Sequence, residues 1–272
     1  MIKSQERRAV RSSRSKLKRG PGRPPAKVAG AMDKGDIVQR ALELCRLESL
    51  QSVSIVRVAN EMGVTPALIH YYVGGRDRLT SGIMNAFYAA LVDELPPTAG
   101  DWRADLTAVF GTIYDFYIRY SGVAAYLMSH NRFRVFQLIE PGERDFGALF
   151  FERVIGAVRV AGLSAASTAM YAHLLFQHVL SSAYQQAGRQ LPEDHQDFLV
   201  SRLQKLSAAE APNTFFILES FAAVRGHDAF RAGLKIVADA IGVERRSARS
   251  ASRGGASHRS SRRPKRALSR QS

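Results

Sequence analysis

One segment of the chain, Ser54 to Arg76, gathers side chains that hold phosphate oxygens and base edges at helical spacing. Hydroxyl, imidazole and guanidinium groups donate hydrogen bonds to phosphate oxygens, and such contacts position a protein on a nucleic acid without reading its sequence. The groups of this kind are Ser54, Thr65, His70, Tyr71, Tyr72 and Arg76. Arg57 lies among them and is the side chain here that can make a bidentate contact to guanine. The chemistry indicated is recognition of a polyanion.

The same segment contains the signals of two short helices joined by a tight turn. Ser54 caps a helix whose apolar residues Ile55, Val58, Ala59 and Met62 fall on one face. Gly63 supplies the left-handed backbone that ends this helix, and Thr65 with Pro66 begins the next one. This arrangement matches a DNA-binding helix-turn-helix unit. A tight helical corner in an ordinary all-α protein is the alternative.

The basic charge of the chain is concentrated at its two ends. Residues 1–30 and 244–272 each carry ten Lys or Arg against one Glu, for +9 each. The formal total is +15, so the two ends together leave residues 31–243 at −3. Attraction to a polyanion is therefore a property of the tails, and it depends strongly on salt. Binding to a membrane surface is less favoured, because neither tail has an amphipathic apolar face.

The N-terminal segment 1–30 is rich in Ser, Arg, Gly and Pro, and this composition predicts a disordered arm. Within it, Gly22-Arg23-Pro24 is extended and flat, and an arginine held in this way enters a narrow A·T-rich minor groove. A solubilising linker is an equally weighted interpretation. The C-terminal segment 243–272 is Arg- and Ser-rich without apolar periodicity, and it too is predicted to be disordered.

Length and composition bound the remaining possibilities. A chain of 272 residues with 46% hydrophobic content has room for one small domain and one larger domain. The single cysteine, Cys45, excludes an intramolecular disulfide and lies on an apolar helical stripe, which predicts a packed core thiol. No apolar run approaches the ~18 residues that span a bilayer, and the N-terminus has no apolar stretch behind its charges. A cytoplasmic protein is expected.

The apolar periodicity predicts an all-α fold without strand pairs. A first helix is expected over 34–48, with Ile37, Ala41, Leu44 and Cys45 facing inward, and a fourth begins near Arg76 and ends before Pro96-Pro97. Further helices are expected over 101–119, 122–130, 143–161, 164–187, 194–209, 213–224 and 227–241. The predicted architecture is an N-terminal three-helix helix-turn-helix domain followed by a larger helical bundle.

The order of residues from Ile37 to Leu79 resembles the DNA-binding domain of TetR-family transcriptional regulators. The matching positions are Ile37, Ala41-Leu42-Glu43-Leu44, Ser54, Val58-Ala59, Met62-Gly63-Val64-Thr65-Pro66-Ala67, Ile69-His70-Tyr71-Tyr72-Val73, Arg76 and Leu79. Beyond them the resemblance rests on the number and lengths of helices and on a final Phe230-x-x-Gly233-Leu234 helix. It implies a homodimer with a DNA-binding domain over 31–79 and a ligand-binding, dimerising domain over 80–242.

The resemblance also assigns roles by position, with several departures from the family pattern. The positions that would face bases are Val56, Arg57, Pro66, Ala67, Leu68 and Tyr71, although Arg57 as an ordinary surface charge is an even alternative. His70 stands where the family commonly has a phosphate-binding tyrosine, and Tyr72 stands where a histidine is usual. Gly75 replaces the serine that caps the fourth helix, while the cation after it is kept as Arg76. The donors near phosphates are therefore retained.

The larger domain is dense in aromatic residues, which predicts either a packed core or an apolar ligand pocket. A pocket of this kind is apolar with a few polar groups that fix the ligand's orientation. The candidate ligand-binding residues are Phe110, Tyr114, Tyr117, Tyr126, His130, His173 and Gln177. In a helical bundle an aromatic stripe is more often core. The ligand favoured by this composition is hydrophobic and uncharged or weakly anionic.

Two helices carry the features of a dimer seam. Residues 164–187 present Met170, Leu174, Leu175, His178 and Ser181-Ser182, and residues 227–241 present Phe230, Leu234, Ile236, Val237 and Ile241. Small residues beside apolar ones permit close two-fold packing of helix pairs. A monomer with an internal bundle is the alternative.

The combined interpretation is a dimeric repressor that binds a palindromic operator on double-stranded DNA and is released by a small hydrophobic effector. The rival class is an architectural DNA-binding protein that uses its basic tails without an effector. An enzyme is not expected, because no nucleophile, phosphate-loop or metalloprotease motif occurs. No metal site or cofactor is expected either, since His173 and His178 fall on different helix faces. The operator, the effector and the role of the C-terminal tail are not encoded in any pattern found.

Overall fold

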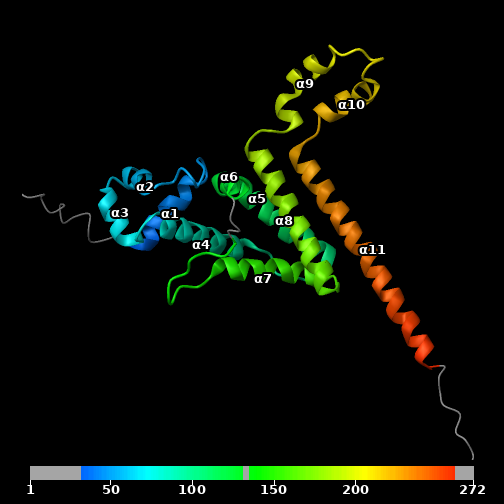
Figure 1. Ribbon diagram of the computed structural model, residues 1–272, viewed down its shortest axis with the longest axis horizontal. Coiled ribbons are helices and arrows are strands. Elements are labelled where there is room, and N and C mark those ends of the chain that lie inside the picture. Colours follow the sequence, from blue (N-terminus) through cyan, green and yellow to red (C-terminus); the bar gives the residue numbers. More distant parts are fainter. Residues whose placement is uncertain (1–31, 131–134, 261–272) are drawn as a thin grey trace, which may run out of the picture. The chain divides into compact units, whose positions relative to one another are not determined.

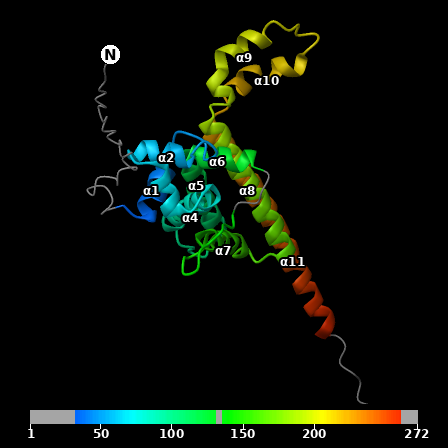
Figure 2. The same ribbon diagram turned by 60° about the vertical axis from the view of Figure 1, so that its left-hand side comes forward.

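The computed structural model describes residues 32–130 and 135–260, and every regular element in these ranges is helical. The all-α prediction is therefore confirmed. The chain divides into a short unit, Met1–Asp33, and a large unit, Lys34–Ser272, to which all the helices belong. Figures 1 and 2 show the succession of helices from α1 to α11. Among the described residues, no helix is both long and apolar enough to span a membrane.

The first three helices pack on one another around a small apolar core. They are α1 (Lys34–Leu44), α2 (Ile55–Met62) and α3 (Pro66–Val73), and α1 contacts both others. The inner stripe predicted for α1 is buried, including Ile37 and Cys45 at 0% exposure. The helix ends at Leu44 instead of Glu48, because the amides of residues 45–47 turn back to carbonyls three residues earlier. Residues 45–50 thus form a separate turn between α1 and α2.

The ends of α2 and α3 are fixed by the capping residues that the sequence indicates. The Ser54 hydroxyl accepts a hydrogen bond from the Arg57 amide at 3.1 Å, and the Thr65 hydroxyl accepts one from the Leu68 amide at 3.4 Å. Gly63 ends α2 with a φ of 66°, which is a left-handed conformation. Glycine adopts this conformation more easily than residues that have a side chain. These caps define the angle between α2 and α3.

A long fourth helix connects this unit to the rest of the chain. Helix α4 (Arg76–Glu94) packs on α1 near its start and on α7 (Phe146–Arg159) further along. Its Phe87 and Tyr88 are fully buried and contact aromatic rings of α5 (Trp102–Arg119) and α7. The short helix α6 (Ser121–Ser129) follows α5 directly. Aromatic packing therefore makes α4 a common support for both parts of the molecule.

Helices α8 (Ala165–Ala187) and α11 (Gly226–Ser260) run side by side, as Figures 1 and 2 show. Between them in the sequence lie η1 (Pro192–His195), α9 (Gln196–Leu203) and α10 (Pro212–Ala222), which pack on one another. Helix α11 also contacts α5, where the Trp102 ring lies under two guanidinium groups. The Arg103 and Arg245 guanidinium carbons are 4.7 and 5.7 Å from the ring centre.

Helix α11 continues beyond its predicted end at residue 241. The prediction that disorder begins at residue 243 is wrong as far as Ser260, the last residue of the helix. Arg and Ala favour helices, and the Ser247 and Ser250 hydroxyls donate to carbonyls four residues earlier. Apolar periodicity does not reveal this extension, because Ile241 is the last deeply buried side chain among those described in the helix. Residues 261–272 of the predicted tail lie outside the described ranges.

Candidate nucleic-acid interface and ligand cavity

Helix α3 presents one exposed face that runs along most of its length. Thr65, Pro66, Ala67, His70 and Tyr71 are exposed, and Tyr71 is 80% exposed. Ile69 and Val73, in contrast, are buried. Leu68 and Tyr72 are half-buried, between the exposed face and the buried one. The exposed face is apolar near the helix start and carries donors further along.

Arg76 joins the start of α4 to the chain that precedes α2. One of its guanidinium nitrogens donates to the Gln51 carbonyl oxygen at 2.7 Å. The side chain remains exposed, and the other nitrogens of its guanidinium group are donors too. Gly75, immediately before it, has a φ of 126° and no side chain to cap α4. Arg76 therefore combines a structural bond with a position suited to a phosphate contact.

Arg57, the candidate for reading guanine, is held by two carboxylates. Its Nε lies 2.9 Å from a Glu48 oxygen, and one terminal nitrogen lies 2.9 Å from a Glu61 oxygen. Glu61 also pairs with Arg40. The hydrogen bond that Arg57 donates to Glu61 is the largest factor that raises the pKa of Arg57 above its ordinary value. The remaining N–H groups of the guanidinium point in directions fixed by these pairs, so Arg57 is oriented rather than a loose surface charge.

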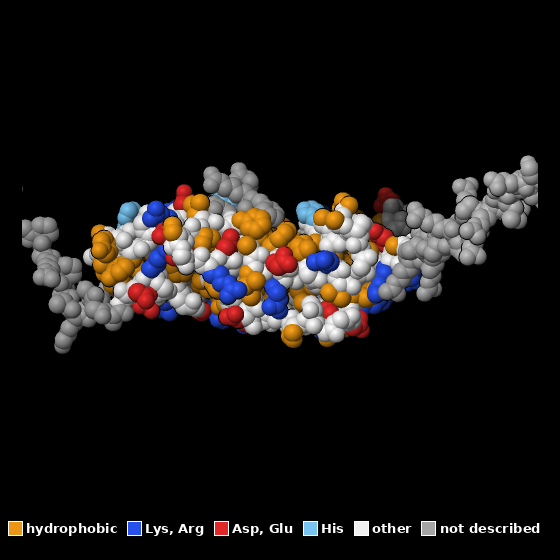
Figure 3. Space-filling model, turned by 90° about the horizontal axis from the view of Figure 1, so that it is seen from below, with side chains coloured by type: hydrophobic (Ala, Val, Ile, Leu, Met, Phe, Trp, Pro, Cys, Tyr) orange, Lys and Arg blue, Asp and Glu red, His pale blue; other side chains and the backbone are white. Residues whose placement is uncertain are grey.

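Three further residues that are predicted to contact DNA lie outside helix α3. Val56 is 54% exposed on α2, next to Arg57, and Ser54 is half-buried at the helix start. Arg23 lies outside the described residues, so its predicted minor-groove role stays a prediction. The described side chains do not form a single-sign field: on the face in Figure 3, Lys and Arg are interspersed with Asp and Glu.

An apolar cavity of about 380 Å³ lies among the helices of the larger part. Its wall is formed mainly by α7 and α8, with contributions from α4, α5, α6 and the segment before α7. The lining residues are Tyr88, Tyr117, Leu127, Val135, Phe151, Ile155, Ala169, Ala172, His173, Phe176, Gln177 and Leu180. None of these described residues is an acid, a lysine or an arginine. The cavity therefore suits an uncharged apolar molecule of moderate size.

Three of the seven predicted ligand-binding residues line this cavity: Tyr117, His173 and Gln177. Phe110 is fully buried and contacts the Phe176 ring from behind the wall. Tyr114 is turned toward α11, where its ring stacks on Phe230 with centres 4.0 Å apart.

Tyr126 and His130 are also absent from the lining, and their rings stack on each other at the end of α6. The aromatic stripe of α5 is thus divided between core and cavity. Phe110 and Tyr114 belong to the core that was the more frequent alternative, and Tyr117 belongs to the wall.

Two tyrosines, Tyr88 and Tyr117, contribute hydroxyl groups to the cavity wall. Tyr88 and Tyr117 are hydrogen-bonded to each other, and burial raises the pKa of both well above the ordinary value for tyrosine. Both therefore remain un-ionised at any physiological pH. Together with His173 and Gln177 they supply the hydrogen-bonding groups of an otherwise apolar wall.

Sequence reasoning missed most of the wall for an identifiable reason. Ala169, Ala172, Phe176 and Leu180 fall with His173 and Gln177 on one stripe of α8, at helical spacing. The sequence pattern of this helix indicates a dimer seam, and a single helix can carry a second functional face. Phe151 and Ile155 come from α7, whose proximity to α8 is a tertiary fact that no local pattern contains.

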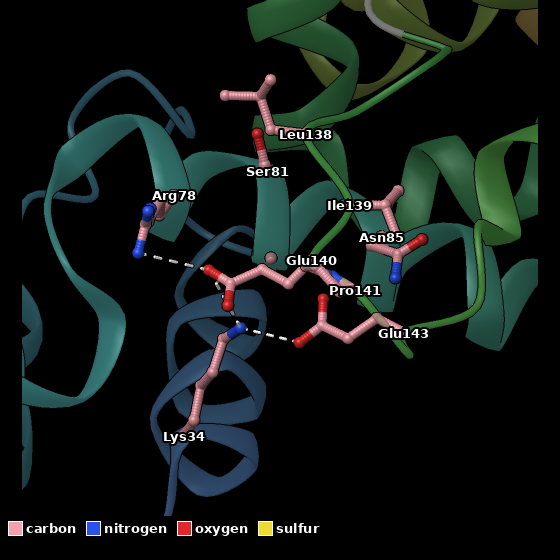
Figure 4. A pocket seen from close by; sticks show the side chains of 10 residues that line it. Lys34, Arg78, Ser81, Asn85, Leu138, Ile139, Glu140, Pro141 and Glu143 are labelled. Atoms are coloured by element: carbon pink, nitrogen blue, oxygen red, sulfur yellow. Dashed lines mark hydrogen bonds and ion pairs between the residues drawn. The ribbon is translucent and has the colours of Figure 1, made fainter.

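A second hollow, of about 270 Å³, is polar and lies where α1 and α4 meet the segment before α7 (Figure 4). Lys34 pairs with Glu143 at 2.7 Å and with Glu140 at 3.9 Å, and Arg78 pairs with Glu140 at 3.5 Å. Both cations are thus already matched by carboxylates. The arrangement is an ionic tie between the helix-turn-helix unit and the rest of the chain.

Comparison with solved structures identifies the fold as that of TetR-type regulators. No family model and no curated protein sequence matches the chain. The apo structure of ActR from Streptomyces coelicolor is similar with a TM-score of 0.66 and 21% identity, covering 81% of this chain and 100% of that one.

Two other structures from Streptomyces coelicolor agree with this. ActR in complex with actinorhodin is similar with a TM-score of 0.64 and 23% identity, over 78% of this chain and 96% of that one. Another TetR-type transcriptional regulator is similar with a TM-score of 0.59 and 20% identity, over 76% and 96% of the two chains. The helix-turn-helix unit and the helical bundle of this chain therefore have the TetR arrangement.

Proposed function

We propose that this protein is a dimeric, sequence-specific transcriptional regulator whose hold on DNA is controlled by a small uncharged ligand. The observation that carries the proposal is the combination of two features on one TetR fold. Helix α3 presents an exposed face beside an oriented arginine, Arg57, and the helical bundle contains an apolar cavity of about 380 Å³. An architectural protein that uses charge alone requires neither feature.

The proposed DNA contacts divide into positioning and reading groups. Ser54, Thr65, His70, Tyr71, Tyr72 and Arg76 would hold phosphate oxygens, and Arg23 of the N-terminal arm would add a minor-groove contact. Arg57 would read guanine, while Pro66, Ala67 and Leu68 would contact thymine methyl groups with Val56 beside them. The unit that does this spans residues 31–79.

The proposed effector is an apolar molecule with one or two polar groups. Tyr117, His173 and Gln177 would fix its orientation, and the apolar wall would contribute most of its affinity. ActR, a regulator of similar fold, has been determined in complex with actinorhodin and with (S)-DNPA. That precedent supports a ligand in the bundle without indicating which ligand this chain takes.

The proposed dimer uses the outer faces of α8 and α11. Met170 is 59% exposed and Ile236 is 69% exposed, while Leu175, Phe230, Leu234 and Ile241 are buried within the chain. The seam would therefore consist of the residues that stay exposed, and the buried ones join α8 to α11. The ligand-binding and dimerising domain would span residues 80–242. A regulator of this kind would act on chromosomal DNA in the cytoplasm.

Selection of bound sequences from a random DNA pool at about 0.15 M salt tests the proposal. A palindromic site with a defined footprint is the expected result, and half-sites should be a whole number of helical turns apart. A library of uncharged aromatic compounds would then be screened for molecules that raise the melting temperature and release the selected DNA. A footprint that spreads along DNA and vanishes with salt would favour the architectural alternative.

A further inference from the structure

The turn between α1 and α2, residues 45–50, is fastened to α6 by backbone atoms. The Gly122 N–H donates to the Cys45 carbonyl oxygen at 2.8 Å, and the Gly122 carbonyl accepts from the Leu50 N–H at 3.1 Å. These two bonds bracket the turn, which we call the corner. Gly122 is itself buried near the start of α6. Gly122 thus makes two backbone hydrogen bonds to the corner, beside hydrogen bonds that join Tyr120 and Ser121 to Arg46.

Only a residue without a side chain fits at this place. A Cβ on Gly122 would lie 1.9 Å from the Glu48 carbonyl oxygen and 2.7 Å from the Cys45 carbonyl oxygen. Both obstacles are backbone atoms, so rotation of a side chain brings no relief. Gly111 and Gly156, which also lie within helices, have no atom within 4 Å of a built Cβ. Gly122 therefore differs from these two glycines, although Gly147 in α7 would also place a Cβ 2.0 Å from a backbone oxygen, that of Val135.

The corner carries the carboxylate that orients Arg57. Glu48 lies within residues 45–50, and its side-chain oxygen is 2.9 Å from the Arg57 Nε. The other carboxylate on Arg57 comes from Glu61 of α2, the same helix as Arg57, and moves with it. Displacement of the corner relative to α2 would therefore change the direction of the guanidinium through Glu48.

The opposite end of α6 reaches the ligand cavity. Leu127 lies on α6 and forms part of the cavity wall, and α6 packs along α8. A helix transmits a displacement along its axis because its backbone bonds hold its residues together. One short rigid element thus touches the cavity at Leu127 and the corner at Gly122.

We propose that Gly122 is a positioning residue for DNA reading, which sets the orientation of Arg57 through the corner and Glu48. This inference rests on the proposed function, because it concerns which base Arg57 reads. It extends that function by naming the route from α6, and so from the cavity wall, to sequence preference.

The test compares base-preference profiles of the full-length protein and its variants, each obtained by selection from a random DNA pool. The variants are Gly122→Ala, Glu48→Gln and Arg57→Ala, with Gly111→Ala as the matched control. Arg57→Ala identifies the base position that Arg57 reads. Gly122→Ala is expected to lower the preference for guanine at that position about tenfold and to leave the other positions unchanged. Gly111→Ala is expected to match wild type.

Glu48→Gln keeps the inference testable if Gly122→Ala does not fold, because it weakens the hold on Arg57 without adding a Cβ. It should change the same position as Arg57→Ala does. A Gly122→Ala protein that folds and either keeps the wild-type profile or loses all positions equally would overturn the inference. So would an Arg57→Ala profile identical to wild type. A wild-type protein that selects no sequence would instead refute the proposed function.

Discussion

Arg57 shows at the level of one residue what a sequence pattern contains and what it omits. Its place on the outer part of α2 follows from the helical spacing of Val58 and Ala59, which are buried. Its partners do not follow, since Glu48 comes from the preceding turn and Arg40 reaches Glu61 from α1. The sequence does not distinguish a base reader from a surface charge at this position, because the network that holds Arg57 is tertiary.

A substitution at the exposed start of α3 tests whether this helix faces DNA, as proposed. We expect Ala67→Glu to lower affinity for the selected site about tenfold or more, because it places a carboxylate against the electronegative groove. The fold should not suffer, since an acid in the first turn of a helix is favourable by roughly 0.3–1 kcal/mol. Gel-shift titration and thermal unfolding measure the two effects.

The matched control is Ala108→Glu on α5, which is also an exposed helical position. It should bind DNA like wild type. Equal binding by Ala67→Glu and wild type would mean that α3 does not enter the groove.

The buried thiol of Cys45 makes the free energy of unfolding decrease at alkaline pH. Burial, helped by the nearby Glu48 charge, raises the pKa of its thiol from 9.0 to about 12. The unfolded chain therefore loses this proton near pH 9 while the folded chain keeps it, so stability is complete below pH 9 and falls as pH rises toward 12. The loss approaches about 1.4 kcal/mol per pH unit within this window.

We expect the Cys45→Ala protein to have a lower free energy of unfolding than wild type. Between pH 8 and pH 10, however, its free energy of unfolding should fall by roughly 1 kcal/mol less than that of wild type. Urea unfolding at the two pH values measures this difference, and the comparison cancels the titration of other groups. Parallel losses in the two proteins would show that the thiol is not protected.

At the level of elements, local signals predict the helix-turn-helix unit better than the bundle. The ends of α2 and α3 depend on Ser54, Gly63 and Thr65, each of which acts on its immediate neighbours. The cavity depends on which faces of α7 and α8 meet, and α11 continues on helix propensity without an apolar stripe. Tertiary packing and propensity decide these features, and hydrophobic periodicity reports neither.

The cavity wall on α8 offers a test of ligand binding that is independent of DNA. Ala172 is 2% exposed and lines the cavity, so Ala172→Leu would place extra carbon atoms inside it. We expect at least about a tenfold loss of affinity for a ligand found by thermal-shift screening, because the variant fills space that the ligand occupies. Operator affinity without ligand should stay within about twofold of wild type, since Ala172 lies on α8, away from the reading helix.

Calorimetry with Ala172→Leu and with Ala108→Leu, an exposed α5 control, provides the measurement. Unchanged ligand affinity in Ala172→Leu would place the binding site elsewhere in the bundle.

The whole molecule combines charge at its ends with an apolar surface that remains uncovered. Residues 1–30 and 244–272 supply the net positive charge, so the arms would add a salt-dependent attraction to any DNA. Specific affinity for a palindromic site requires two helix-turn-helix units at the spacing of successive major grooves. A single chain has one such unit. The uncovered residues of α8 and α11 are the natural place for a second copy to bind.

Negative charge introduced on this surface of α8 and α11 should cause the dimer to dissociate into monomers. We expect Met170→Glu combined with Ile236→Glu to give a monomer by light scattering, because both side chains are exposed in the single chain and would be buried in a dimer. Binding to a palindromic site should fall at least about a hundredfold, while weak binding to single half-sites persists.

Leu138→Glu, an exposed apolar residue on the segment before α7, serves as the control and should leave the dimer intact. A double variant that still sediments as a dimer would assign the seam to another surface.

The position of Trp102 gives the protein an internal optical probe. It is the only tryptophan of the chain, and it is 8% exposed beneath Arg103 and Arg245. Arg245 belongs to α11, so separation of α11 from α5 would admit water to the indole and shift its emission to longer wavelength. Because the helix-turn-helix unit contains no tryptophan, the tryptophan emission of the unlabelled protein reports on the bundle alone. The tryptophan emission can therefore report on ligand binding, while a different signal reports on DNA release in the same sample.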